Sequence, residues 1–208
     1  MPSDEPIRKR MKRRERAGDI RFVTFSCYRR LPLLRHAAIS RLFVETLASV
    51  HARMRFELYA YVVMPEHVHL LIRPGTEYPM DRILVAIKHR VARTVIARWR
   101  TLQARVLQQI ETPSGARFWQ KGGGFDRNVR SVSEFTRAVH YIHQNPVSRG
   151  LVNVATEWEY LSVHAWLARY RGRPIEPSPR CDSPPGREDW LKWAGFMEWP
   201  DGLDTLHG

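Results

Sequence analysis

The chain contains 208 residues, of which 43% are hydrophobic, so it is long enough and apolar enough for one folded domain with a core. Its longest apolar runs are strand-sized and far shorter than the roughly 20 residues that span a bilayer, which excludes a membrane protein. Its 34 Lys and Arg against 21 Asp and Glu give a net charge of +13 and favour a nucleic-acid partner, while two distant cysteines exclude a disulfide scaffold.

The first 18 residues form a basic segment in which positions 8–16 hold seven positive charges and one negative charge. A run of like charges without apolar periodicity is typical of a solvated, flexible arm. It lacks the apolar stretch of a secretory signal, so we expect a cytoplasmic, nucleoid-associated protein. The arm could serve solubility alone, although binding to nucleic-acid phosphates is favoured. The basic residues concerned are Arg8, Lys9, Arg10, Lys12, Arg13 and Arg14.

The folded part of the sequence begins near Ile20 with alternating apolar residues. This alternation predicts a strand over 20–28, with Phe22, Thr24 and Ser26 on one face. Helical spacing of apolar residues predicts a helix over 37–54. Two more strands are expected over 57–64 and 68–73, and then an amphipathic helix over 80–100.

The middle of the chain carries a glycine triplet at 122–124 between two short segments, 117–120 and 125–129, which we interpret as strand and loop. The triplet either makes a tight turn or lets the backbone approach DNA closely. A capping box of Ser131 and Glu134 begins another helix. This helix is expected to end near Asn145, because a following proline disfavours helical geometry.

The resulting order β-α-β-β-α-β-α predicts an α+β fold with an antiparallel sheet, as in a split βαβ domain. Beyond it, five prolines within 171–188 predict an extended linker. An aromatic cluster at 190–199 follows, which either packs on the domain or binds a partner. We therefore expect a basic arm over 1–18, a folded domain over 19–170 and a C-terminal extension over 171–208.

Two histidines, His67 and His69, are the first candidates for chemistry. In a strand they point to the same face, so both imidazoles could hold one divalent metal ion. Such a pair is also common as hydrogen-bonded strand residues that bind nothing.

The predicted helix after Ser131 offers a second candidate. Tyr141 and Asn145 are one turn apart and share a face of that helix. A tyrosine at such a position is by default a core or surface residue. His143 lies about 200° around the helix from Tyr141 and is not expected to contact its hydroxyl group.

Several basic residues and one tryptophan are candidates for contacting nucleic acid. Trp119 could stack on an unpaired base or simply belong to the core. The candidates for phosphate contacts are Arg82, Lys88, Arg90, Arg93, Lys121 and Arg127.

Three segments together resemble the HUH single-tyrosine transposases, a family of insertion-sequence and REP-associated enzymes. They are M-P-E-H-V-H-L-L at 64–71, F-W-Q-K-G-G-G-F-D-R-N-V at 118–129 and Y-I-H-Q-N-P-V-S-R-G-L-V at 141–152. The resemblance implies a ferredoxin-like catalytic domain that cuts and joins single-stranded DNA. It assigns metal binding to His67, His69 and Asn145, and the role of nucleophile to Tyr141.

The same resemblance implies Mg²⁺ or Mn²⁺ as cofactor and a 5′-phosphotyrosine intermediate. The basic arm and the C-terminal extension favour the REP-associated branch, whose members act on hairpins of palindromic repeats, here as a monomer or a homodimer. The alternative is a non-catalytic, domesticated nucleic-acid-binding regulator on the same fold. A zinc hydrolase is poorly supported, because no third His or Cys stands at zinc-ligand spacing.

Overall fold

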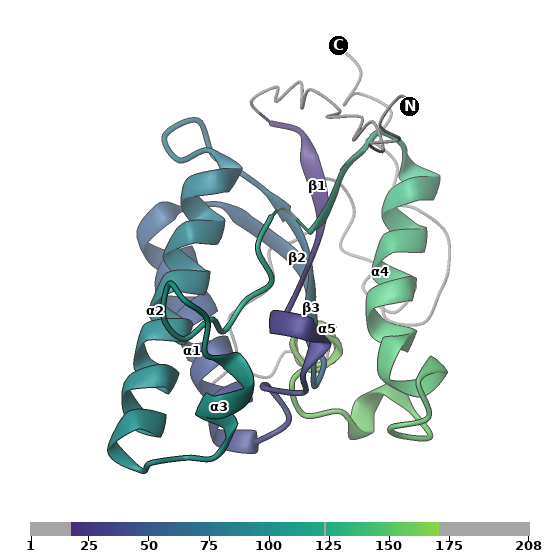
Figure 1. Ribbon diagram of the computed structural model, residues 1–208. Coiled ribbons are helices and arrows are strands. Elements are labelled where there is room, and N and C mark those ends of the chain that lie inside the picture. Colours follow the sequence, from purple (N-terminus) through teal and green to yellow (C-terminus); the bar gives the residue numbers. More distant parts are fainter. Residues whose placement is uncertain (1–17, 123, 171–208) are drawn as a thin grey trace, which may run out of the picture.

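The computed structural model describes residues 18–122 and 124–170, which fold around one antiparallel sheet with helices on both faces (Figure 1). The order of the strands in the sheet is β2-β3-β1-β4. Their bounds are β1 (Ile20–Ser26), β2 (Glu57–Val63), β3 (His67–Arg73) and β4 (Phe125–Val129). Because the antiparallel β3 lies between β1 and β2, this is the split βαβ arrangement, and the predicted ferredoxin-like α+β fold is confirmed.

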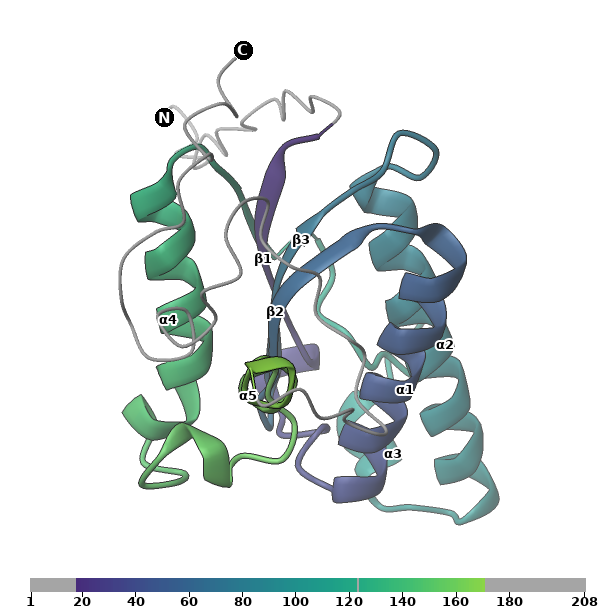
Figure 2. The ribbon, with the colours of Figure 1, turned by 180° about the vertical axis from the view of Figure 1, so that it is seen from behind.

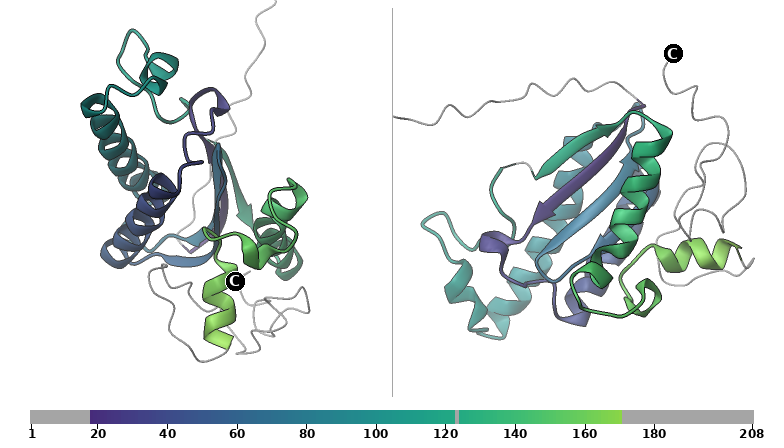
Figure 3. Two further views of the ribbon diagram at one scale, coloured as in Figure 1. Left: turned by 90° about the horizontal axis from the view of Figure 1, so that it is seen from below. Right: turned by 90° about the vertical axis from the view of Figure 1, so that its right-hand side faces the viewer.

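Helices form a layer on each side of the sheet (Figures 2 and 3). The two long helices α1 and α2 lie side by side on one face, and α4 covers the other face, as the edge-on view in Figure 3 shows. The helices are α1 (Ala37–Met54), α2 (Met80–Thr101), α3 (Val106–Ile110), α4 (Val132–Ser148) and α5 (Val163–Tyr170). Two short 3-10 helices, η1 (Tyr28–Arg30) and η2 (Ala155–Glu157), complete the described part.

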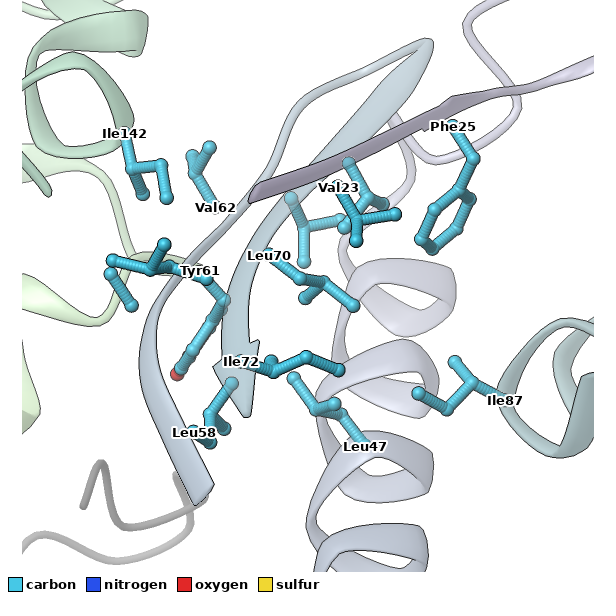
Figure 4. Packing of buried hydrophobic residues seen from close by; sticks show 14 of the residues in the cluster. Val23, Phe25, Leu47, Leu58, Tyr61, Val62, Leu70, Ile72, Ile87 and Ile142 are labelled. Atoms are coloured by element: carbon cyan, nitrogen blue, oxygen red, sulfur yellow. The ribbon is translucent and has the colours of Figure 1, made fainter. Parts of the chain in front are cut away.

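The alternation of side chains along β1 and β3 divides the core between the two faces. Figure 4 shows Val23 and Leu70 directed toward α1 and α2, where they pack with Leu47 and Ile87 in a mainly apolar layer. The residues between them in sequence, such as Phe22 and Thr24, point to the opposite face, which α4 covers. That second face carries the polar groups described below.

The helix α4 is longer than the sequence predicted, since it continues through Pro146 to Ser148. The prediction that it ends near Asn145 is therefore wrong. Both residues are buried, and the carbonyl oxygens of Asn145 and Pro146 accept hydrogen bonds from the backbone N–H groups of Arg149 and Leu151, which close the last turn. Packing and these bonds offset the local preference against helix before a proline.

The region between α2 and α4 differs in detail from its prediction. Residues 117–120 form no full strand; Trp119 makes a single bridge to Cys27. Gly122 adopts a left-handed backbone with φ of +93°, as a turn requires, whereas Gly124 lies directly against β1. The α3 and α5 helices were not predicted.

Within the described ranges, no helix is both long and apolar enough to cross a membrane. The predicted linker and aromatic cluster over 171–208, and residues 1–17 of the predicted arm, lie outside the described residues.

Candidate active site

A pocket of about 670 Å³ lies between α4 and the sheet face that carries Phe22 and Thr24. Elements distant in sequence line it: β1, the short helix η1, the start of β3, β4 and α4. All four residues that the resemblance assigned to catalysis, namely His67, His69, Tyr141 and Asn145, line this one pocket.

The two histidines of β3 meet at the bottom of this pocket. Both are almost fully buried, and their Nε2 atoms lie 2.9 Å apart. Strand alternation places them on one face, as predicted, and the register with β1 sets Thr24 opposite His69 and Ser26 opposite His67.

Hydrogen bonds orient each imidazole through its other nitrogen. The Nδ1 atom of His67 lies 3.0 Å from Glu66 Oε1, and that of His69 lies 2.7 Å from Thr24 Oγ1. A carboxylate can only accept, so His67 Nδ1 donates and its Nε2 keeps a free lone pair. The Thr24 hydroxyl oxygen can likewise accept a hydrogen bond from His69 Nδ1, which leaves the lone pair of His69 Nε2 free. The two lone pairs would then face one another, an arrangement that a cation between them stabilises.

The amide of Asn145 supplies a third polar group. Its Nδ2 lies 3.4 Å from His69 Nε2, and its Oδ1 is buried without a hydrogen-bond partner. A buried oxygen without a hydrogen-bond partner destabilises the folded state unless a ligand binds to it. Two imidazole nitrogens and one amide oxygen are suitable ligands for Mg²⁺ or Mn²⁺, and nitrogen ligands favour Mn²⁺. These three residues therefore fit a divalent metal ion.

No cluster of three His, Cys, Asp or Glu side chains suited to a metal ion occurs among residues 18–122 and 124–170.

The electrostatic environment keeps both imidazoles neutral. Burial lowers the pKa of His69 to about 3, and repulsion from a proton on His67 and from the charges of Arg149 and Arg30 acts in the same direction. The pKa of His67 is also lowered, mainly by burial, although Glu66 acts in the opposite direction. Neutral imidazoles with free lone pairs are the form that binds a metal ion.

Glu66 remains ionised beside them. Burial acts to raise its pKa, but the electrostatic interactions and hydrogen bonds with His67 and Arg149 more than offset this, and the pKa is lowered. Its Oε1 accepts a hydrogen bond from Arg149 at 2.9 Å as well as the one from His67. Glu66 therefore links β3 to the end of α4.

Tyr141 stands at the open side of the pocket, with 51% of its surface exposed. Its ring packs edge-on against His69 at 5.2 Å and against Phe22 at 5.9 Å between centroids. The hydroxyl-bearing ring is thus next to the histidine pair and accessible to a large substrate. Asn145 follows one helical turn later and points to the same pocket, as the spacing predicted.

Arginines dominate the rest of the lining. Arg30, Arg127, Arg137 and Arg149 line the pocket, and no Asp or Glu is among its lining residues. Arg29 and Arg30 both adopt left-handed backbone conformations, with φ of 52° and 55°. Such strain costs about 1–2 kcal/mol per residue, and it persists where surrounding contacts hold the loop in place. Here it brings Arg30 beside the histidines.

The structure separates the predicted DNA-contacting residues into two groups. Arg127 lines the pocket, and Lys121 is exposed nearby in sequence. The residues on α2 lie on the opposite side of the sheet from the pocket (Figure 3). Of these, Arg82, Arg90 and Arg93 are exposed, whereas Lys88 is half-buried with its Nζ 5.4 Å from the Phe25 ring centroid.

Trp119 is a core residue, so the interpretation that it stacks on an unpaired base is wrong. Only 8% of it is exposed, its ring packs on Phe25 and Phe118, and its Nε1 donates to the Lys88 carbonyl oxygen at 2.8 Å. With its polar group satisfied inside the protein, this indole presents no free surface.

Sequence reasoning missed Thr24, Arg30, Phe125 and Arg149, which line the pocket, and Glu66, which is not part of the lining but is hydrogen-bonded to His67. Glu66 and Arg149 lie inside the segments that carried the resemblance, so their position was a usable signal. Thr24 and Phe125 become part of the site only through strand register, which no local pattern specifies. The N-terminal candidates Arg8 to Arg14 lie outside the described residues.

Comparison with known proteins identifies related sequences. A family model described as "Transposase IS200 like" matches residues 17–145. The REP-associated tyrosine transposase of Escherichia coli (strain K12) is 26% identical over 144 residues, which cover 66% of this chain and 67% of that protein. A relative from Haemophilus influenzae is 29% identical over 115 residues, 52% of this chain and 60% of that protein.

Among solved structures, that of a REP-associated tyrosine transposase bound to a REP hairpin aligns with a TM-score of 0.58. It is 20% identical in sequence, and the alignment covers 86% of this chain and 93% of that chain. At this identity the likeness concerns the fold.

Proposed function

Since the chain belongs to the family of IS200-like transposases, we propose that it is a metal-dependent enzyme that cleaves and rejoins single-stranded DNA beside hairpins. The observation that carries the proposal is the meeting of His67, His69, Asn145 and Tyr141 in one arginine-lined pocket. These residues come from a strand and a helix that are about 70 positions apart in sequence. Core packing alone does not require a buried, unpaired amide oxygen beside two facing imidazole nitrogens.

Tyr141 acts as the nucleophile in this proposal. Its phenolic oxygen attacks the phosphorus of a DNA phosphodiester, forming a bond between tyrosine and the 5′ phosphate while the bond to O3′ breaks. The phenolic proton passes to water, and the leaving O3′ takes up a proton to become a hydroxyl. Because the new ester retains the energy of the broken one, a 3′-OH of another strand can reverse the step and join DNA without ATP.

His67, His69 and Asn145 would hold the divalent ion. When bound there, Mg²⁺ or Mn²⁺ supplies positive charge to the scissile phosphate as a Lewis acid. Hydrogen bonds to the Nδ1 atoms hold the two imidazoles in place: Glu66 orients His67, and Thr24 orients His69.

The arginines position the substrate. Arg30 and Arg149 flank the histidine pair and are suited to bind the oxygens of the scissile phosphate. The exposed Arg82, Arg90 and Arg93 of α2 lie on the opposite side of the sheet from the pocket and cannot reach that phosphate. They are proposed to contact more distant phosphates, for example in a DNA hairpin, together with the basic residues 8–14.

A hairpin substrate is proposed because the relatives matched over most of the family domain are REP-associated, and one solved neighbour is bound to a REP hairpin. The test is a cleavage and joining assay with single-stranded oligonucleotides that contain a hairpin, carried out with Mg²⁺ or with Mn²⁺ and, as the metal-free control, with EDTA. We expect metal-dependent cleavage of the single strand and none of a fully paired duplex. No cleavage of any hairpin substrate with either metal would contradict the proposal and favour a binding protein on the same fold.

A further inference from the structure

One large aromatic side chain stands exposed at the mouth of the pocket. Phe125, the first residue of β4, has 57% of its surface exposed and lines the pocket with Tyr141. Its ring packs edge-on against Phe22, with 6.0 Å between centroids, and Phe22 in turn packs against Tyr141. An aromatic ring that is more than half exposed adds little to the core, so its place beside the proposed nucleophile calls for another explanation.

Strand register fixes where this ring lies. Thr24 of β1 is paired with His69 on one side and with Phe125 on the other, so the three residues form one row across the sheet. Neighbouring strands are about 4.8 Å apart, which puts Phe125 roughly 10 Å from His69 along this row. Arg127 lies in the next row on the same face, opposite Phe22. Phe125 thus lies two strands away from His69, on the sheet face that carries the proposed reacting groups.

The charge around the ring favours a polyanion as the occupant. Arg127 and Arg137 both line the pocket and are exposed, and Arg127 forms a loose ion pair with Glu134 at 3.9 Å. An exposed ring beside exposed guanidinium groups is typical of surfaces that bind single-stranded nucleic acid, where bases stack on rings and cations contact the backbone.

We propose that Phe125 is a stacking platform for an unpaired base of the DNA strand that enters the pocket, with Arg127 and Arg137 contacting the phosphates beside that base. The inference rests on the proposed function for its ligand class. The sequence suggested base stacking for Trp119, and this inference assigns that role to Phe125 instead. Stacking on a ring needs no particular base, so this subsite holds the strand without reading its sequence.

The test compares two strands that differ in bases alone. A Tyr141→Phe background prevents cleavage, and the affinities for a dT12 oligonucleotide and for an abasic 12-mer are measured by fluorescence anisotropy. With Phe125 present, dT12 is expected to bind about ten-fold more tightly than the abasic strand. Phe125→Leu should remove most of that ratio and leave the affinity for the abasic strand unchanged, while Phe125→Trp should preserve it.

A matched control is Leu102→Ala, because Leu102 is also 57% exposed but lies at the end of α2, away from the pocket. It should change neither affinity. A dT12-to-abasic ratio near one with Phe125 present, an unchanged ratio in Phe125→Leu, or an equal loss for both strands would overturn the inference. Because binding is measured without cleavage, failure of the nuclease proposal and failure of the stacking platform give different results.

Discussion

The carbonyl oxygen of Thr24 occupies the space where a side chain at position 124 would begin. A Cβ atom placed on Gly124 would lie 1.4 Å from that oxygen, a distance at which one of the two strands must move. Thr24 is also the residue whose Oγ1 lies 2.7 Å from His69 Nδ1. Gly124 therefore leaves room for the Thr24 carbonyl oxygen. It keeps Thr24 in the position from which it orients His69, a proposed metal ligand.

Replacing this glycine is expected to damage both the fold and the site. Gly124→Ala must separate β4 from β1, so we expect a loss of about 2–4 kcal/mol in the free energy of unfolding, together with weaker Mn²⁺ binding. Urea denaturation and metal titration measure the two effects. Gly75→Ala is the control, because its Cβ would be 3.4 Å from the nearest atom, the Arg55 carbonyl oxygen. Equal stability of the two variants would show that Gly124 has room for a side chain.

Glu66 is expected to matter for metal affinity although it would not touch the ion. Glu66→Gln removes the charge that orients His67 and pairs with Arg149, and loss of such a partner typically weakens metal binding about 10–100-fold. Isothermal titration with Mn²⁺ gives the affinity. Glu159→Gln, which changes an exposed pair with Arg41, should leave it unchanged. Equal affinity of both variants and the unmodified protein would contradict the role of Glu66.

Asn145 is expected to contribute one oxygen to the metal. Asn145→Ala should weaken Mn²⁺ binding at least about ten-fold, while Asn145→Asp, which keeps an oxygen and adds charge, should bind at least as well as the unmodified protein. His67→Ala and His69→Ala should abolish binding. The exposed His89 on α2 provides a control substitution, His89→Ala, with no expected effect. Titration followed by electron paramagnetic resonance of free Mn²⁺ distinguishes these cases.

The sequence predicted the parts of this site better than their assembly. Alternation in β3 correctly placed His67 and His69 on one face, and the spacing of Tyr141 and Asn145 correctly placed them one turn apart. Their meeting depends on α4 packing against the sheet, which joins residues 76 positions apart and leaves no local signal.

Errors arose where burial decides the outcome. Trp119 is followed by Gln120, Lys121 and a glycine triplet, a polar context compatible with an exposed surface, yet its indole donates to the Lys88 carbonyl oxygen and lies in the core. Likewise Pro146 is buried, and tertiary packing extends α4 beyond the point that local preferences predict. Phe125 does lie in a strand, β4, and its proposed role depends on its pairing with Thr24, which no local pattern specifies.

The buried histidines predict how stability changes with acidity. Burial lowers the pKa of His69 and that of His143 to about 3, whereas both titrate near 6.5 in an unfolded chain. Between these values the unfolded chain binds more protons, so the free energy of unfolding must fall as the pH is lowered from 6.5 toward 3. Each group contributes at most about 1.4 kcal/mol per pH unit.

His143 lies away from the proposed metal ligands, so its contribution to the pH dependence of the free energy of unfolding can be measured separately. His143 is bonded to Ser162 inside the core, and His143→Asn removes its titration. We expect the slope of the free energy of unfolding between about pH 4 and pH 6 to fall by about 1.4 kcal/mol per pH unit in this variant. Urea denaturation in a pH series measures it. An unchanged slope would mean that His143 is protonated in the folded protein.

The proposal that Tyr141 attacks DNA is tested most directly by locating the covalent bond. The protein is incubated with Mn²⁺ and a hairpin-bearing single strand, the DNA is trimmed with nuclease, and the tryptic peptides are analysed by mass spectrometry. The account predicts a nucleotide attached through a 5′ phosphate to Tyr141, and no adduct in Tyr141→Phe. An adduct on another residue, or an equal yield in Tyr141→Phe, would contradict it.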